Sequence, residues 1–182
     1  VTSRQWYIRN GGRPWTRPAS GADLNDELVE RGRQLEFHPD FMRVRYENWV
    51  RGLKGDWLVS RQRFFGVPFP LWYRVGADGQ VDYDAVITPS EDSLPVDPST
   101  DAPEGFAEEQ RGEPGGFVGE LDIMDTWATS SLSPQLACGW LHDDDLFART
   151  YPMDLRPQGQ DIIRTWLFSS VVRAALEFGA LP

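Results

Sequence analysis

The sequence is poor in the residues that build disulfides, thiolate metal sites and membrane spans. A single cysteine, Cys138, stands among 182 residues, so neither an internal disulfide nor a cysteine cluster for zinc can form. No apolar run approaches the roughly 18 residues that cross a bilayer, and the start shows no signal-peptide pattern. We therefore expect a protein of a reducing compartment, the cytoplasm, with no membrane partner. Because the chain also lacks an initiator methionine, we expect it to be a piece of a longer protein.

Basic residues are nearly absent from one long segment. Fourteen acidic residues lie between Asp78 and Asp125, against the single base Arg111, and several prolines and glycines interrupt the stretch. Such a composition predicts a solvated, loop-rich insertion over residues 78–120. An acidic surface for a basic partner is the less favoured alternative, because acidic runs usually only stay hydrated.

Two helices and two short strands are expected around this insertion. Apolar residues at helical spacing predict an amphipathic helix over 22–33. A second helix is expected over 39–53, with Pro39 in its first turn. Its shared face is expected to consist of Phe41, Val44 or Arg45, Asn48 and Trp49. Aromatic and branched residues predict strands over 57–59 and 67–73.

The C-terminal third shows the clearest organisation. Residues 121–127 and 151–157 are expected to be strands, and a helix over 162–178 is expected to end at Gly179. A strand, the Gly159–Asp161 turn and a helix would make half of a crossover unit. Because such units bind ligands beside the helix N-terminus, this turn is a candidate nucleotide or substrate site in an α/β fold with a parallel sheet.

Four motifs occur in one order along the chain: Arg4 to Tyr7 (RQWY), Gly55 to Tyr73 (GDWLVSRQRFFGVPFPLWY), Glu120 to Pro134 (ELDIMDTWATSSLSP) and Gly159 to Ser170 (GQDIIRTWLFSS). Together they resemble the catalytic domain of the valyl-tRNA synthetase family of class I aminoacyl-tRNA synthetases, downstream of its editing insertion. The resemblance covers nearly the whole chain except the acidic block. It implies the second half of a Rossmann-type sheet, with segments 1–77, 78–120 and 121–182 as re-entering segment, connective insertion and second nucleotide-binding half.

The resemblance implies activation of valine with ATP and magnesium, followed by transfer to tRNA(Val). The family's chemistry depends on two signatures, HIGH and KMSKS. With only His38, His142 and Lys54 available, this chain supplies neither of them. We therefore expect no catalytic residue and no zinc in this chain, and we expect the chain alone to be inactive.

The resemblance also carries candidate site residues. Trp127, Ile162 and Trp166 match the positions that line the family's pocket for the valine side chain. Spacing agrees with part of this, since Ile162 and Trp166 are four residues apart on the expected helix and share a face. Core filling is the alternative role of the tryptophans.

Gly159 and Asp161 match the family's turn for the adenosine of ATP, where a carboxylate can accept hydrogen bonds from ribose hydroxyls. The alternative for Asp161 is a helix N-cap. Arg61 and Arg63 are candidate tRNA phosphate contacts, or partners of carboxylates.

Three other functions stay open at this point. The parent could prefer isoleucine or leucine, since sister enzymes share parts of these motifs. The chain could be a noncatalytic binding module derived from a synthetase. It could also be an unrelated nucleotide-binding α/β protein, which should then bind ATP by itself.

Overall fold

The computed structural model of the chain describes residues 4–8 and 24–182, and it divides into two compact units. The helical unit comprises residues 125–182 and the described part of residues 1–59. The sheet unit is the continuous segment 60–124. Each unit has its own core, and each is described by itself.

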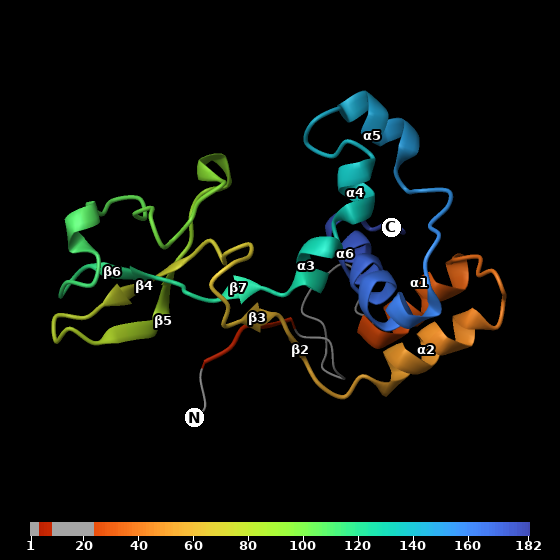
Figure 1. Cartoon of the computed structure of the whole chain (residues 1–182), viewed down its shortest axis with the longest axis horizontal. Coiled ribbons are helices and arrows are strands. Elements are labelled where there is room, and N and C mark those ends of the chain that lie inside the picture. Colours follow the sequence, from red (N-terminus) through yellow and green to blue (C-terminus); the bar gives the residue numbers. More distant parts are fainter. Residues whose placement is uncertain (1–3, 9–23) are drawn as a thin grey trace. The chain divides into compact units, whose positions relative to one another are not determined.

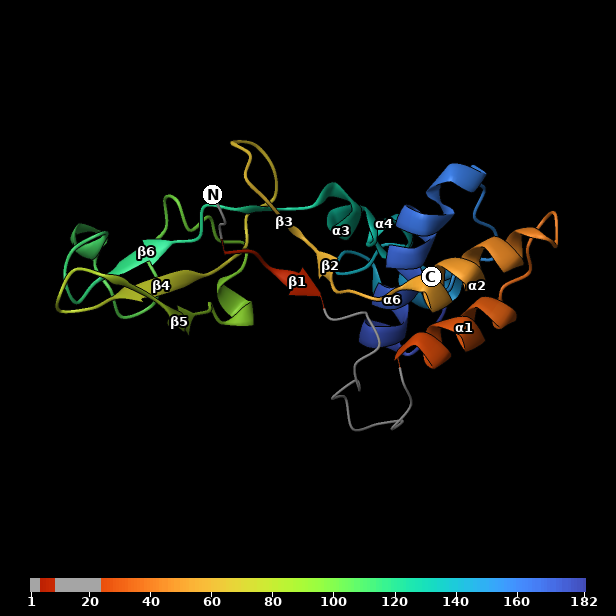
Figure 2. The same cartoon turned by 90° about the horizontal axis from the view of Figure 1, so that it is seen from below.

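Three helices build the core of the helical unit: α1 (Leu24–Gln34), α2 (Met42–Gly52) and α6 (Phe168–Phe178), which lie side by side in Figures 1 and 2. Leu28, Tyr46 and Val171 are fully buried between them. The Tyr46 hydroxyl donates a hydrogen bond of 3.1 Å to the Leu28 carbonyl, and burial raises the pKa of this phenol. Gly32 allows this close packing, because a Cβ there would lie 2.4 Å from a Tyr46 ring carbon.

Both helices predicted in the first third of the chain are present. The first spans Leu24–Gln34, while residues 22 and 23 of the prediction lie outside the described residues. The second begins at Met42, because residues 39–41 form a turn with i to i+3 hydrogen bonds. The predicted face of this helix is wrong at Phe41 and Val44, which are 67% and 54% exposed. It is right at Trp49, which packs against the core, and Tyr46 and Val50 are the residues buried in that core.

The expected strands at residues 121–127 and 151–157 are largely replaced by other structure. Only β7 (Ile123–Met124) is extended in the first, because the Asp125 carboxylate accepts a hydrogen bond from the Trp127 amide and begins α3 (Thr126–Ser130). Residues 151–157 are irregular. Between them lie α4 (Ser133–Ala137) and α5 (Asp144–Thr150).

The helix expected over 162–178 has three parts. A 3₁₀ turn, η3 (Gln160–Ile162), leads into a π-helical segment, η4 (Ile163–Leu167), and only then into the regular helix α6. The predicted end is confirmed, because Gly179 adopts a left-handed conformation with φ of 63°. Single π turns inside helices occur frequently at functional sites.

Short antiparallel ladders account for all the named strand pairs in the described residues. In the helical unit, β1 (Tyr7–Ile8) pairs with β2 (Trp57–Leu58), where a strand was predicted. In the sheet unit, β3 (Ser60–Arg61) pairs with β7, and β4 (Trp72–Val75) lies between β5 (Val81–Ile87) and β6 (Phe117–Gly119), as Figure 2 shows for the latter sheet. These residues have the mixed helix and sheet content of an α/β protein, but the expected parallel sheet is not among their ladders.

The acidic block is more ordered than its composition predicted. It contributes β5 and β6 to the three-stranded sheet, together with the 3₁₀ turns η1 (Glu91–Ser93) and η2 (Glu108–Gln110). Phe117 of the block is fully buried and pairs, within β6, with the strand β4 that carries the buried Trp72. The strand predicted over 67–73 begins later, at Trp72, after an isolated bridge at Pro68.

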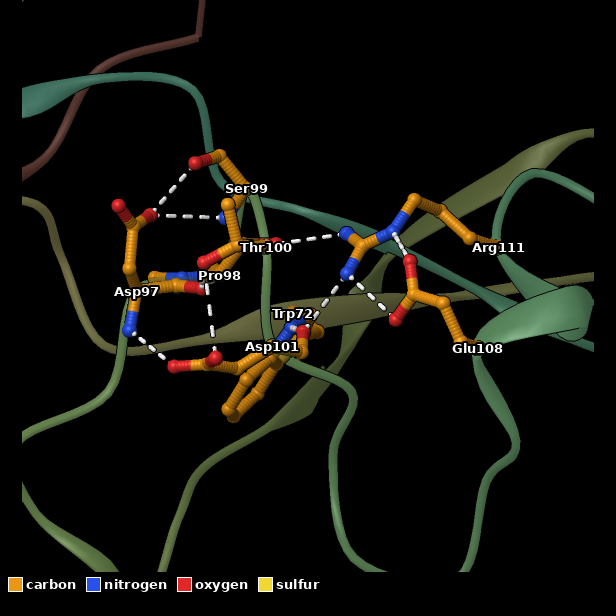
Figure 3. Close-up of polar contacts among 8 residues, drawn as sticks. All are labelled: Trp72, Asp97, Pro98, Ser99, Thr100, Asp101, Glu108 and Arg111. Carbon is orange, nitrogen blue, oxygen red and sulfur yellow. Dashed lines mark hydrogen bonds and ion pairs between the residues drawn. The ribbon is translucent and has the colours of Figure 1, made fainter.

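Arg111, the one base of the acidic block, joins two loops of the sheet unit (Figure 3). Its guanidinium donates to the carbonyls of Pro98 and Asp101 at 2.7 and 2.8 Å, pairs with the Glu108 carboxylate, and lies 5.0 Å from the Phe117 ring centroid. The Asp101 carbonyl also accepts a hydrogen bond from the buried Trp72 indole. Arg111 therefore connects the segment 97–101 to the start of β6.

We expect the Arg111→Gln substitution to destabilise the sheet unit by about 1–2 kcal/mol, because two carbonyls lose a charged donor. This corresponds to a melting point lower by about 4–8 °C per kcal/mol for a unit of this size. Arg63→Gln, which removes an exposed arginine of the same unit, is the control and should have little effect. Equal melting points for the two variants in thermal unfolding would contradict this role of Arg111.

Candidate functional site

The turn at Gly159–Asp161 is exposed and open. Gly159 has an extended backbone (φ −71°, ψ 153°), and a Cβ built on it would meet nothing within 4 Å. Neither the backbone conformation nor packing within this chain therefore requires a glycine here. Asp161 is exposed and lies inside η3, for which Gly159 is the N-cap, so the alternative role of Asp161 as the N-cap is wrong.

Ile162 and Trp166 lie one turn apart where η3 passes into η4. Both are half-buried, whereas their neighbours Ile163 and Leu167 are buried in the core of the helical unit. The core residues fix this segment from one side. The side chains of Ile162 and Trp166 are therefore on the flank of the segment, at the border between core and surface.

Trp166 is anchored to the short helix that carries Trp127. Its indole N–H donates to the Ser130 carbonyl at 3.1 Å and to the Ser133 hydroxyl at 3.3 Å. Ser130 is the last residue of α3, and Trp127 lies in the first turn of the same helix with 37% of its surface exposed. A third hydrogen bond, from Arg173 Nε to the Ser131 hydroxyl at 2.7 Å, joins α6 to the residue that follows α3.

The structure thus brings α3, which carries Trp127, against η4, which carries Trp166, and against α6. Ile162 is the last residue of η3, which leads directly into η4. Trp127 and Trp166 make no ring-to-ring contact in the part of the chain that the structure describes. Their connection is one helical turn of α3 and the hydrogen bond at Ser130.

Arg61 and Arg63 belong to the sheet unit. Arg61 is half-buried in β3 and donates to the Ser60 carbonyl at 2.7 Å, whereas Arg63 is exposed. The loop that follows carries Phe64 and Phe65, which are 105% and 89% exposed. Arg63 is thus followed in the sequence by two exposed aromatic residues, and nucleic-acid-binding surfaces combine these residue types.

Several residues that hold Trp166 were not found from the sequence. Ser130, Ser133 and Arg156 lie 36, 33 and 10 positions before Trp166 in the sequence. Ser130 and Ser133 belong to the motif Glu120 to Pro134, but their residue types did not indicate a contact with Trp166. The Arg156 guanidinium carbon lies 4.5 Å from the centroid of the Trp166 ring. Only the folded structure reveals these contacts.

Within residues 4–8 and 24–182, no group of three or more His, Cys, Asp or Glu side chains is placed to hold a metal ion. Cys138 is buried as a free thiol. No helix in these ranges is long and apolar enough to cross a membrane.

The whole chain, residues 1–182, matches the family model of class I tRNA synthetases (I, L, M and V). The chain therefore belongs to the class I tRNA synthetase family.

Within this family, the chain is similar to valine–tRNA ligases of several bacteria. It is 68% identical over 186 residues to the enzyme of Bifidobacterium longum (strain DJO10A), 62% identical over 182 residues to that of Thermobifida fusca (strain YX), and 61% identical over 182 residues to that of Cutibacterium acnes (strain DSM 16379 / KPA171202). Each comparison covers 100% of this chain. The chain spans 20% of the length of each of these relatives.

Proposed function

We propose that this chain is part of a valine–tRNA ligase, an enzyme that activates valine with ATP and transfers it to tRNA(Val). The observation that carries the proposal is identity of 57–68% over the whole chain to valine–tRNA ligases. The four ordered motifs support it, as does the convergence of α3, η4 and α6. In the parent, valine, ATP and tRNA(Val) are the substrates, with magnesium accompanying ATP.

Trp127, Ile162 and Trp166 line the pocket for the valine side chain in this proposal. Two indoles and one branched aliphatic side chain offer a rigid apolar surface to an isopropyl group. One further methylene would have to displace them, at an overpacking cost of about 1–3 kcal/mol. The anchoring of the Trp166 N–H at Ser130 and Ser133 supports a fixed ring position.

Gly159 and Asp161 contact the adenosine of ATP. The missing Cβ of Gly159 leaves space for the nucleotide to approach the backbone, and the exposed Asp161 carboxylate accepts hydrogen bonds from ribose hydroxyls. Arg61 and Arg63 are the proposed tRNA contacts. The charges that stabilise the reacting phosphates come from outside this chain, since it contains neither HIGH nor KMSKS.

The parent is proposed to place these segments in one catalytic domain. Residues 1–77 re-enter it after the editing insertion, residues 78–120 form a connective insertion, and residues 121–182 belong to its second nucleotide-binding half, around a Rossmann-type sheet. The enzyme is proposed to act in the cytoplasm, where its tRNA substrate is found.

The nucleotide part of the proposal is tested with Gly159→Ala and Asp161→Ala in the full-length parent. We expect the KM for ATP in valine-dependent pyrophosphate exchange to rise about 10- to 100-fold for Asp161→Ala, because ribose hydroxyls lose a charged acceptor. Gly159→Ala should raise this KM while leaving thermal stability unchanged, because the added methyl group meets no atom of this chain.

Gly52→Ala is the matched control, since a Cβ at Gly52 also meets nothing within 4 Å. It should leave the KM for ATP unchanged. An unchanged KM in both Gly159→Ala and Asp161→Ala would remove this turn from the ATP site.

A further inference from the structure

Trp166 is held at three places, by Ser130 at the end of α3, by Ser133 at the start of α4 and by Arg156. The edge of the indole is fixed by the Ser130 carbonyl and the Ser133 hydroxyl. The face of the ring is covered by Arg156, whose guanidinium carbon lies 4.5 Å from the ring centroid. This distance is well within the range of a cation–π interaction.

Arg156 also holds the backbone of Trp166 through one intermediate. Its Nη2 donates to the Ser170 hydroxyl at 3.2 Å, and this hydroxyl donates to the Trp166 carbonyl at 2.6 Å. The Ser169 hydroxyl donates to the same carbonyl at 3.2 Å. One guanidinium thus contacts the ring directly and restrains the main chain of the same residue, at the junction of η4 and α6.

Burying the Arg156 guanidinium costs free energy, because the charged group loses its hydration. Its Nε and Nη1 atoms are buried and have no hydrogen-bond partner among the described residues. Burial lowers the pKa of the guanidinium to about 10. A desolvated cation interacts more strongly with an aromatic face than an exposed one does, so the Trp166 ring is a principal partner of this charge.

From these contacts we infer that Arg156 is a positioning residue, which fixes the Trp166 ring and thereby sets how closely the amino-acid pocket fits valine. The inference rests on the proposed function, since it assigns Arg156 a role through a pocket residue. A guanidinium above the ring limits its tilt, and the hydrogen bonds at the ring edge limit its rotation. With Arg156 replaced, the ring can move aside and an extra methylene is accommodated at lower cost.

The test uses Arg156→Gln and Arg156→Lys in the full-length parent, with Arg149→Gln as the control. Arg149 is an exposed arginine of the same unit, paired with Asp145 at 2.8 Å. For Arg156→Gln we expect the ratio of valine to isoleucine kcat/KM in pyrophosphate exchange to fall about tenfold, mainly through a higher KM for valine. Arg156→Lys retains a cation and should recover most of the ratio, although lysine cannot reproduce the planar guanidinium. Arg149→Gln should not change it.

A second readout follows the ring itself. In full-length protein labelled with fluorotryptophan, the ¹⁹F resonance of Trp166, assigned with Trp166→Phe, should shift or broaden in Arg156→Gln and stay in place in Arg149→Gln. If Arg156→Gln does not fold, Ser170→Ala tests the same network while keeping the Arg156 cation in place. It should lower the ratio of valine to isoleucine kcat/KM by a smaller factor.

The inference is overturned if a folded Arg156→Gln variant, or Ser170→Ala in its place, leaves both the resonance and the ratio unchanged. It is also overturned if activities with valine and isoleucine fall by the same factor, which a purely structural role predicts. Failure of the pocket assignment looks different. In that case Trp166→Ala itself leaves the ratio unchanged, while the Trp166 resonance still responds to Arg156.

Discussion

Replacing Trp166 by alanine in the full-length parent is expected to raise isoleucine activation relative to valine by a factor of about 5 to 150. The range corresponds to the roughly 1–3 kcal/mol that an extra methylene costs in a well-packed site. The indole is a rigid wall, because its N–H is bound at Ser130 and Ser133 and its face is covered by Arg156. Its removal leaves space that the longer side chain can fill.

Steady-state pyrophosphate exchange with each amino acid measures this ratio. Trp140→Ala is the matched control, because Trp140 is also a half-buried tryptophan of the helical unit. Its ring packs edge-on against Phe178, with 5.8 Å between the ring centroids. It should lower stability without changing the ratio. A valine to isoleucine ratio that is the same in Trp166→Ala as in the unchanged enzyme would remove Trp166 from the pocket.

The isolated 182-residue chain is expected to show no valine-dependent pyrophosphate exchange above background. Removing a single group that stabilises charge in a transition state typically costs about 10²–10³ in rate, and this chain lacks both of the family's phosphate-binding signatures. In the proposed function, this chain supplies walls of the amino-acid and adenosine sites but not the charges that stabilise the reacting phosphates.

The assay compares the isolated chain with the full-length parent at equal concentration. Because traces of a host enzyme would also give exchange, the isolated chain is measured again with Asp161→Ala. Exchange that persists through purification and disappears in that variant would belong to the chain itself and would contradict the expectation.

Helices with a clear apolar period were predictable from the sequence. The helices α1 and α2 appear where their spacing placed them, and Gly179 ends α6 as a left-handed residue. The buried face of α2 was not predictable from its own residues. Tyr46 is buried because Gly32, on α1, leaves room for its ring. Local periodicity therefore determined the elements, and tertiary packing determined their orientation.

Most of the strand expected at residues 121–127 is absent for a local reason that the alternation of apolar and polar residues does not reveal. The Asp125 side chain caps the following turn, so the segment becomes helical two residues after Met124. The short ladder that remains depends on pairing with β3, some sixty residues earlier in the chain. Composition likewise missed the order of the acidic block, because Arg111 acts on Pro98 and Phe117 only after folding.

Spacing within one motif predicted the relative placement of Ile162 and Trp166, but not the residues that hold Trp166. Ile162 and Trp166 stay one turn apart even though the regular helix is replaced by η3 and η4, since spacing of four residues keeps them on one flank. Ser130, Ser133 and Arg156 come from other segments, and their residue types are common on any protein surface. Nothing in their sequence neighbourhood points to Trp166.

The central claim is that Trp127, Ile162 and Trp166 form one recess for the valine side chain. A crystal structure of the full-length parent with valine and a non-hydrolysable ATP analogue tests this claim most directly. The account predicts that the isopropyl group lies within about 4–4.5 Å of all three side chains, the range of apolar contact. Valine bound with its methyl groups against other residues, and with both indoles out of contact, would contradict it.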